Sequence, residues 1–219
     1  MAKYLLLYKH YLKKYADAIE YTRQFLKEAA VKNQVDLHPW SLPEHRMGHT
    51  LLVLKNSLLL AKNRKVNLDV VALSAIMHDI AAFSSERKEH AEEGAEIAEE
   101  YLRKHRYPDD LVQKVVNSIR VHAGSQVLSP RSDEAKILQD ADTIDKVGAL
   151  SITTFLLHYG SVKMLPEQVL KELKKDMPKR LRWYYKTMNF PEGKRMVSKG
   201  CMYIRGFIQR LQSETECPS

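Results

Sequence analysis

Apolar residues recur at intervals of three or four along most of the chain. Between positions 44 and 64, for example, they are Met47, Leu51, Leu54, Leu58 and Ala61. This spacing places them on one face of an α-helix, whereas the alternation typical of a half-buried strand is absent beyond a few positions. Only 8 glycines and 8 prolines interrupt the chain. The pattern therefore predicts an all-α protein.

Further helices are expected over residues 11–31, 68–80, 87–105, 133–160, 166–186 and 193–212, with one more opening at Pro108. Asp69 and either Ser132 or Asp133 lie where an oxygen or a negative charge stabilises the first turn of a helix. Residues 124–130 are expected to form a loop. The expected architecture is a single helical-bundle domain over residues 43–219, with basic C-terminal helices. An N-terminal helix and a connecting loop precede it over residues 1–42.

Composition narrows the class of protein. A chain of 219 residues with 44% hydrophobic and 28% charged residues is long enough for a sizeable core and unlike a disordered chain. The longest apolar runs are far short of the roughly 20 residues that cross a bilayer, and no secretion signal is expected at the N-terminus. Cys201 and Cys217 form neither a disulfide framework nor a zinc pattern. We therefore expect a cytoplasmic protein with no membrane partner.

The formal net charge is +8, which favours an anionic partner such as a phosphate, a nucleic acid or a membrane surface. Nearly all of the excess lies near the C-terminus, because residues 161–219 hold 13 Lys and Arg against 6 Asp and Glu. The densest part runs into Trp183, Tyr184 and Tyr185, and aromatic rings beside cations can hold a nucleotide or a single strand. The preferred interpretation is a solvated amphipathic helix whose aromatic side chains pack inward.

An ionisable pair, His78-Asp79, follows the apolar run 70–77. A buried pair of this kind needs a charged partner, and a metal ion is one such partner. His49 lies in the predicted helix 44–64, and three carboxylates cluster farther along the chain: Asp140, Asp142 and Asp145. Carboxylates on a core-facing helix repel one another unless a cation neutralises them. Two His and two Asp make a mixed site suited to Mn, Fe, Ni, Co or Zn, and less well to Mg.

This arrangement is similar to that of the HD-domain metal-dependent phosphohydrolases. The family places a His on one helix, a His-Asp doublet at the end of the next long helix, and a distant Asp. The matching residues are His49, His78, Asp79 and, in the run Gln-Asp-Ala-Asp, Asp142. His90, in a segment rich in small residues, and His122 match further positions of the family. The resemblance covers about residues 45–210.

The resemblance implies a divalent metal that activates a water for attack on a small phosphate ester or a nucleotide. The implied metal ligands are His49, His78, Asp79 and Asp142. His90 and His122 would hold a second metal or donate protons to the leaving group, so the expected catalytic residues are Asp79, His90 and His122. Some members use two irons and O₂ instead, which leaves a di-iron oxygenase as an alternative. Nucleic-acid binding through the basic C-terminal segment is a weaker alternative.

The sequence departs from the family pattern near both motifs. Leu52 stands where many members carry Arg, and two alanines at 81–82 follow the doublet in place of Gly-Lys. That Lys commonly helps to neutralise a substrate phosphate. Arg87 or Lys88 could replace it, although a solvated helix start is the preferred interpretation of both. His45 is expected at the surface, and the sequence leaves the substrate, the metal and the oligomeric state open.

Overall fold

The computed structural model describes residues 2–35, 38–39, 41–84, 89–122 and 131–215. Within these ranges the chain forms ten α-helices and no strand, which confirms the all-α prediction. The helices are α1 (Ala2–Lys14), α2 (Ala16–Lys32), α3 (Pro43–Ala61), α4 (Leu68–Met77), α5 (His90–Lys104), α6 (Asp109–Arg120), α7 (Asp133–Asp145), α8 (Ala149–Ser161), α9 (Pro166–Thr187) and α10 (Pro191–Thr215). None of these helices is both long enough and apolar enough to cross a membrane.

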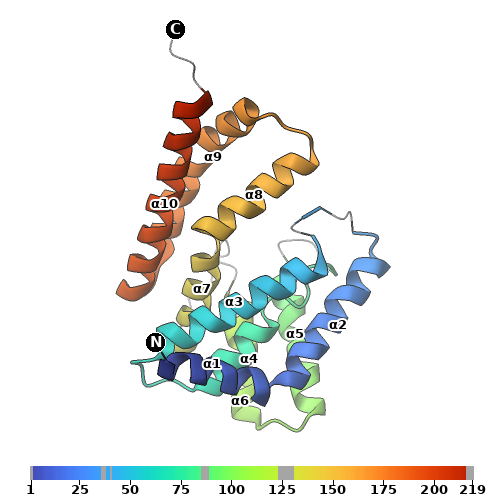
Figure 1. Cartoon of the computed structure of the whole chain (residues 1–219). Helices are drawn as coiled ribbons and strands as arrows, with labels where there is room; N and C mark the ends of the chain where they lie inside the picture. Colours follow the sequence, from blue (N-terminus) through green and yellow to red (C-terminus); the bar gives the residue numbers. More distant parts are fainter. Residues whose placement is uncertain (1, 36–37, 40, 85–88, 123–130, 216–219) are drawn as a thin grey trace.

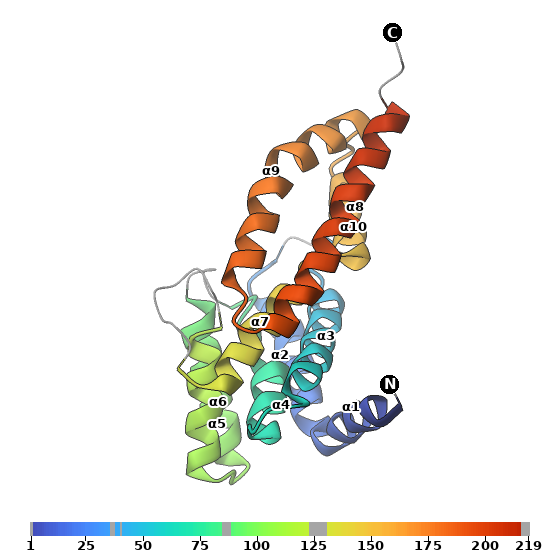
Figure 2. The same cartoon turned by 90° about the vertical axis from the view of Figure 1, so that its left-hand side faces the viewer.

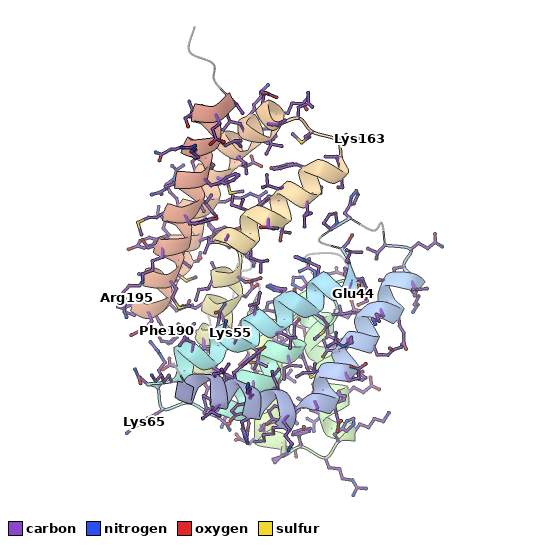
Figure 3. The ribbon with its side chains drawn as sticks, viewed as in Figure 1. Glu44, Lys55, Lys65, Lys163, Phe190 and Arg195 are labelled. Carbon is purple, nitrogen blue, oxygen red and sulfur yellow. The ribbon has the colours of Figure 1, made fainter. Side chains whose placement is uncertain are left out.

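The helices form a bundle and an arm (Figures 1 and 2). In the bundle, α3 and α6 pack on α4, α7 packs on α3, α5 pairs with α6, and α1 and α2 cover α3. α9 and α10 lie side by side and extend away from the bundle, and α8 links α7 to this pair; we call α8–α10 the C-terminal arm. Phe190 lies at the base of the arm and Lys163 near its far end (Figure 3). The division into residues 1–42 and 43–219 stays a prediction.

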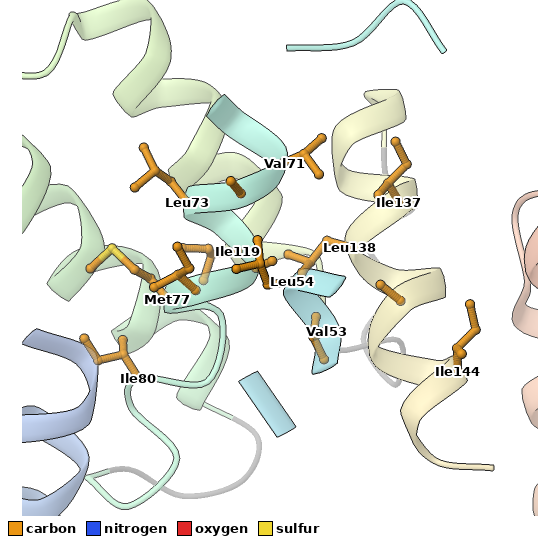
Figure 4. Packing of buried hydrophobic residues seen from close by; sticks show 14 of the residues in the cluster. Val53, Leu54, Val71, Leu73, Met77, Ile80, Ile119, Ile137, Leu138 and Ile144 are labelled. Atoms are coloured by element: carbon orange, nitrogen blue, oxygen red, sulfur yellow. The ribbon is translucent and has the colours of Figure 1, made fainter. Parts of the chain in front are cut away.

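Helix α4 lies at the centre of the bundle. Its side chains from residue 70 to residue 77 are all buried, as expected for a helix that is apolar on every side. Leu54 of α3, Ile119 of α6 and Leu138 of α7 meet around it (Figure 4). Asn67 caps its N-terminus by accepting hydrogen bonds from two backbone N–H groups of the first turn. The residues that follow the C-terminal end of α4, beginning with His78, therefore also lie in the interior.

The prediction of one helix over residues 11–31 is wrong. The chain forms two helices, α1 and α2, and Tyr15 lies between them with φ −115° and ψ 32°. No glycine or proline marks this position. The Tyr15 side chain is buried and interacts with Asp69 at the start of α4. A tertiary contact, rather than a local signal, therefore stabilises the break.

The prediction of one helix over residues 133–160 is also wrong. α7 ends at Asp145 and α8 begins at Ala149. Gly148, between them, has a φ of +99°, a conformation that residues with a Cβ adopt only under strain. The chain therefore turns away from the bundle after α7 and enters the arm. The loop predicted at 124–130 lies outside the described residues.

A candidate metal centre

The structure brings together the six side chains that the sequence singled out. They come from five segments: His49 lies in α3, His78 and Asp79 directly after α4, His90 at the start of α5, His122 just after α6, and Asp142 in α7. Helix α4 ends at Met77 rather than at residue 80 as predicted, and His78 is its C-cap. The doublet therefore lies in the turn that follows the buried helix. His78, Asp79, His122 and Asp142 are buried.

Four of these residues form a first group of converging ligand atoms. Nε2 of His49 lies 3.2 Å from Nε2 of His78 and 3.3 Å from Oδ1 of Asp142. Oδ2 of Asp79 lies 3.6 Å from Nε2 of His49 and 3.7 Å from Nε2 of His78. Two ligands of one ion, each about 2.1 Å from it, lie roughly 3.0–3.4 Å apart. The His49–His78–Asp79 group can therefore hold a metal ion, with Asp142 beside it.

A second group shares Asp79 with the first. Nε2 of His90 lies 3.3 Å from Nε2 of His122. Oδ1 of Asp79 lies 3.5 Å from Nε2 of His122 and 3.7 Å from Nε2 of His90. This group also has the spacing of metal ligands. Asp79 thus presents Oδ2 to one pair of imidazoles and Oδ1 to the other, which is the arrangement of a carboxylate able to bridge two ions.

The buried imidazoles are oriented by bonds at Nδ1. Nδ1–H of His78 donates to the carbonyl oxygen of Ala75 at 2.9 Å, and Nδ1–H of His122 donates to that of Ile119 at 2.6 Å. Because a carbonyl oxygen only accepts, the neutral form of each ring has a bare lone pair at Nε2. Each of these lone pairs faces the Nε2 of another histidine. A proton or a metal ion between the two nitrogens of each pair satisfies the lone pair, so the donors fit a metal ion.

The two histidines of the first group differ in their pKa values. Burial lowers the pKa of His78 to about 4, so this ring is a neutral ligand. Burial also lowers the pKa of His49. The hydrogen bonds of His49 with Asp142 and Asp145 outweigh the effect of burial, however, and raise the pKa of His49 to about 9. Burial raises the pKa of Asp79 and Asp142, yet the facing cationic groups lower both below the usual range. Both carboxylates are therefore ionised at neutral pH.

Three further residues complete the centre; Asp145 was expected only as one of three clustered carboxylates, and Arg46 and Lys146 were not predicted. Asp145 accepts a hydrogen bond of 2.7 Å from Nδ1 of His49. Arg46 donates to Oδ2 of Asp79 at 2.9 Å, and Lys146 donates to Oδ2 of Asp142 at 2.6 Å. The signal that could have found them is helical spacing, because residues three or four apart share a face and each lies that far from a predicted ligand.

Other candidates lie apart from the centre. The buried carboxylate of Asp140 accepts hydrogen bonds from the backbone N–H groups of Asn189 and Phe190, just before α10. Asp140 therefore contacts the base of the arm rather than the candidate metal centre. His45, expected at the surface, is half-buried, and burial lowers its pKa. Arg87 and Lys88 lie outside the described residues.

The aromatic run in α9 only partly follows its preferred interpretation. Tyr184 packs against the core, but Trp183 and Tyr185 are exposed. Exposed lysines and arginines lie within a few positions of them in the same helix, among them Lys179 and Arg182. The inward packing expected of all three rings is therefore wrong for two of them.

Comparison with known proteins agrees with this geometry. The sequence model of the HD domain matches residues 46–146, a span that contains every residue of the centre. A solved structure described as a predicted HD superfamily hydrolase, from an uncultured Thermotogales bacterium, is 26% identical over 90% of this chain and 92% of that one, with a TM-score of 0.59. Among curated proteins, none matches this chain.

Two Bacillus structures share the fold at lower identity. An HD-superfamily hydrolase from Bacillus thuringiensis is 22% identical over 91% of this chain and 97% of that one, with a TM-score of 0.64. YpgQ of Bacillus subtilis, in complex with ADP, is 14% identical over 87% of this chain and 97% of that one, with a TM-score of 0.59. Residues 46–146 therefore match an HD domain, and the whole chain shares the fold of these HD-superfamily hydrolases.

Proposed function

We propose that this protein is a metal-dependent phosphohydrolase that acts on a small phosphate ester or a nucleotide. The observation that carries the proposal is the position of Asp79, whose two oxygens face two separate pairs of imidazole nitrogens. A buried donor set of this composition suits a divalent transition metal (Mn, Fe, Ni, Co or Zn) better than Mg. The phosphoester substrate class rests on the resemblance and on the cations around the site.

The ligand assignment follows the two groups. His49, His78, Asp79 and Asp142 would hold one divalent ion, and His90 and His122 with Asp79 could hold a second. When bound, the ion would supply a water nucleophile near neutral pH and polarise a phosphoryl oxygen. Asp145 fixes the ring of His49 through Nδ1, and the Ala75 carbonyl does the same for His78.

His90 and His122 differ in access. The His122 side chain is buried and fixed by the Ile119 carbonyl, whereas the His90 side chain is 17% exposed. His90 is therefore better placed to reach a leaving-group oxygen, and His122 to hold a fixed position. If only one ion binds, we assign proton donation to His90.

Two observations support an anionic substrate. Arg46 and Lys146 lie at the centre, and the net charge of +8 comes mainly from the C-terminal residues. A nucleotide is the finer proposal, and YpgQ, which shares the fold, was solved in complex with ADP. Stacking of a base on the exposed aromatic rings of α9 would add to recognition.

The test begins with metal analysis of protein purified without chelator. It continues with a panel of nucleotides and phosphate esters assayed with that metal restored. We expect metal-dependent release of phosphate or pyrophosphate, and a loss of about 10³-fold or more in Asp79→Asn, because both groups lose their shared ligand. Asp110→Asn, which removes an exposed partner of Lys114, is the matched control. Full activity of Asp79→Asn, or full activity after complete metal removal, would refute the proposal.

A di-iron oxygenase is the second candidate, and the bridging position of Asp79 favours it as much as a two-metal hydrolase. This alternative predicts two irons per chain and substrate-dependent consumption of O₂. It also predicts no hydrolysis across the phosphate-ester panel. The metal analysis and an oxygen electrode distinguish the two chemistries.

Nucleic-acid binding is the third and weakest candidate. It is favoured by the exposure of Trp183 and Tyr185 among the basic residues of α9. It predicts tight binding of a single-stranded oligonucleotide whose affinity falls steeply with salt. Trp183→Ala would weaken such binding if the rings stack on bases, without lowering hydrolysis of a phosphate ester that carries no base.

A further inference from the structure

Two cations lie at the edge of the metal centre. Arg46 contacts Asp79 and Lys146 contacts Asp142, and their side chains are 33% and 41% exposed. The predicted ligands are all less exposed, His90 being the most accessible at 17%. A dissolved anion that approaches the centre therefore meets Arg46 and Lys146 first.

The two cations differ in which oxygen of the partner carboxylate they contact. Arg46 is bound to Oδ2 of Asp79, the same oxygen that faces His49 and His78. Lys146 is bound to Oδ2 of Asp142, whereas the other oxygen, Oδ1, faces His49. A divalent ion held by the first group would compete with Arg46 for one oxygen. The same ion would leave the contact of Lys146 in place.

Arg46 also has a donor that the described residues do not use. Its Nε is buried and has no hydrogen-bond partner among them. A buried N–H without an acceptor costs free energy, so the position favours a ligand that supplies one. The N–H groups of a guanidinium form a planar fork that matches two oxygens of a phosphate. A phosphate group is therefore the acceptor that suits Arg46.

We propose that Arg46 binds a phosphate oxygen of the substrate, and that a metal ion frees it to do so by replacing it on Oδ2 of Asp79. The inference rests on the proposed function and names its phosphate-binding residue. Because both ligands act on one side chain, metal binding and anion binding are coupled. Removal of Arg46 should then strengthen metal binding and weaken anion binding.

Titration calorimetry on the 219-residue chain measures both affinities without any turnover. In chelator-treated protein, Arg46→Gln should bind Mn²⁺ about 3- to 10-fold more tightly than wild type, because no cation competes for Asp79. In Mn²⁺-loaded protein, the same variant should bind inorganic phosphate at least about tenfold more weakly. Arg46→Lys keeps the charge and loses the fork, so its phosphate affinity should be intermediate.

Arg23→Gln is the matched control, because Arg23 forms an exposed ion pair with Glu20 in α2. Both affinities of that variant should stay within about twofold of wild type. A loss of both affinities in Arg46→Gln and Arg46→Lys would indicate a structural role and overturn the inference, and so would an unchanged phosphate affinity. If wild type binds no Mn²⁺, the proposed function fails as well. If wild type hydrolyses phosphate esters but Arg46→Gln binds phosphate normally, only this inference fails.

Discussion

Three carboxylates within six positions of α7 divide between two parts of the structure. Asp142 faces Nε2 of His49, Asp145 holds Nδ1 of the same ring, and Asp140 accepts backbone N–H groups ahead of α10. The period of the helix explains the division. At about 100° per residue, Asp142 and Asp145 lie some 60° apart on one face, while Asp140 points to another. Asp140 therefore stabilises a different part of the fold from Asp142 and Asp145, although all three lie in one helix.

Asn substitutions at Asp142 and Asp140 test this division. Asp142→Asn should lower metal affinity by about 10- to 100-fold and leave the melting temperature of the chelator-treated protein nearly unchanged or higher. Asp140→Asn should keep the metal stoichiometry but lose about 1–3 kcal/mol of stability, since it weakens hydrogen bonds to buried N–H groups. Metal analysis and thermal unfolding of both variants are the measurements. The opposite pattern would contradict the assignment.

Under the proposed ligand assignment, Asp145 would act on a bound metal only through His49. Asp145→Asn should reduce metal affinity by about 10- to 100-fold, because the His49 ring loses both its orientation and part of its basicity. The number of ions bound at saturation should stay the same. Asp133→Asn, which removes an exposed partner of Lys136 at the other end of α7, should leave the affinity unchanged. Equal affinity of Asp145→Asn and wild type would show that the Nδ1 bond has no effect on the metal.

At the scale of elements, the arm depends on a close approach between α10 and the end of α7. A Cβ added at Gly200 would lie 2.5 Å from Cγ2 of Val147. Gly206, farther along α10, has no neighbour within 4 Å of the same position. Both glycines lie in α10, but only Gly200 packs closely against another segment.

Alanine substitutions of these glycines should therefore have opposite effects. Gly200→Ala should destabilise the protein by about 1–3 kcal/mol, because the clash pushes α10 away from Val147. Gly206→Ala should stabilise it by about 0.5–1 kcal/mol, because alanine loses less backbone entropy in a helix. Chemical denaturation measures both changes. Destabilisation by Gly206→Ala would show that α10 is not packed as described.

At the scale of the whole molecule, the interior contains an unusual concentration of ionisable groups. Four histidines and three aspartates meet in the candidate metal centre. Two partly exposed cations, Arg46 and Lys146, lie at its edge. The arm carries most of the excess positive charge outside this centre. The positive charge that could attract an anion is therefore divided between the arm and the two cations at the edge of the candidate metal centre.

Metal affinity should depend on pH in a defined direction. The pKa of His49 is raised to about 9, so below that pH an ion must displace a proton from the ring. Affinity should therefore rise as pH increases from 6 to 9, by up to about tenfold per pH unit, and level off above 9. His78, with its pKa lowered to about 4, adds no proton release in this window.

Calorimetry in two buffers of different ionisation enthalpy counts the protons released. About one proton per ion is expected at pH 7. Asp145→Asn should reduce this number, because the hydrogen bond that raises the pKa of His49 is weakened. Metal binding that is independent of pH between 6 and 9 would contradict the protonation assigned to His49.

The sequence by itself determined the fold class and the ligand candidates. Helical periodicity is local, so the pattern around Met47, Leu51 and Leu54 was sufficient to predict a helix. The doublet His78-Asp79 stood out because ionisable residues followed an apolar run. The helix breaks at Tyr15 and Gly148 were missed for different reasons: the first depends on a contact with Asp69, and the second on a backbone angle that one glycine permits.

Only the tertiary structure decided which atoms face one another. His49 and Asp142 are 93 positions apart, and no local pattern specifies that Nε2 of one lies 3.3 Å from Oδ1 of the other. The same holds for the two oxygens of Asp79 and for the contact of Arg46 with one of them. Propensity acts between near neighbours in the sequence, whereas a metal centre depends on side-chain directions set by packing of the whole bundle.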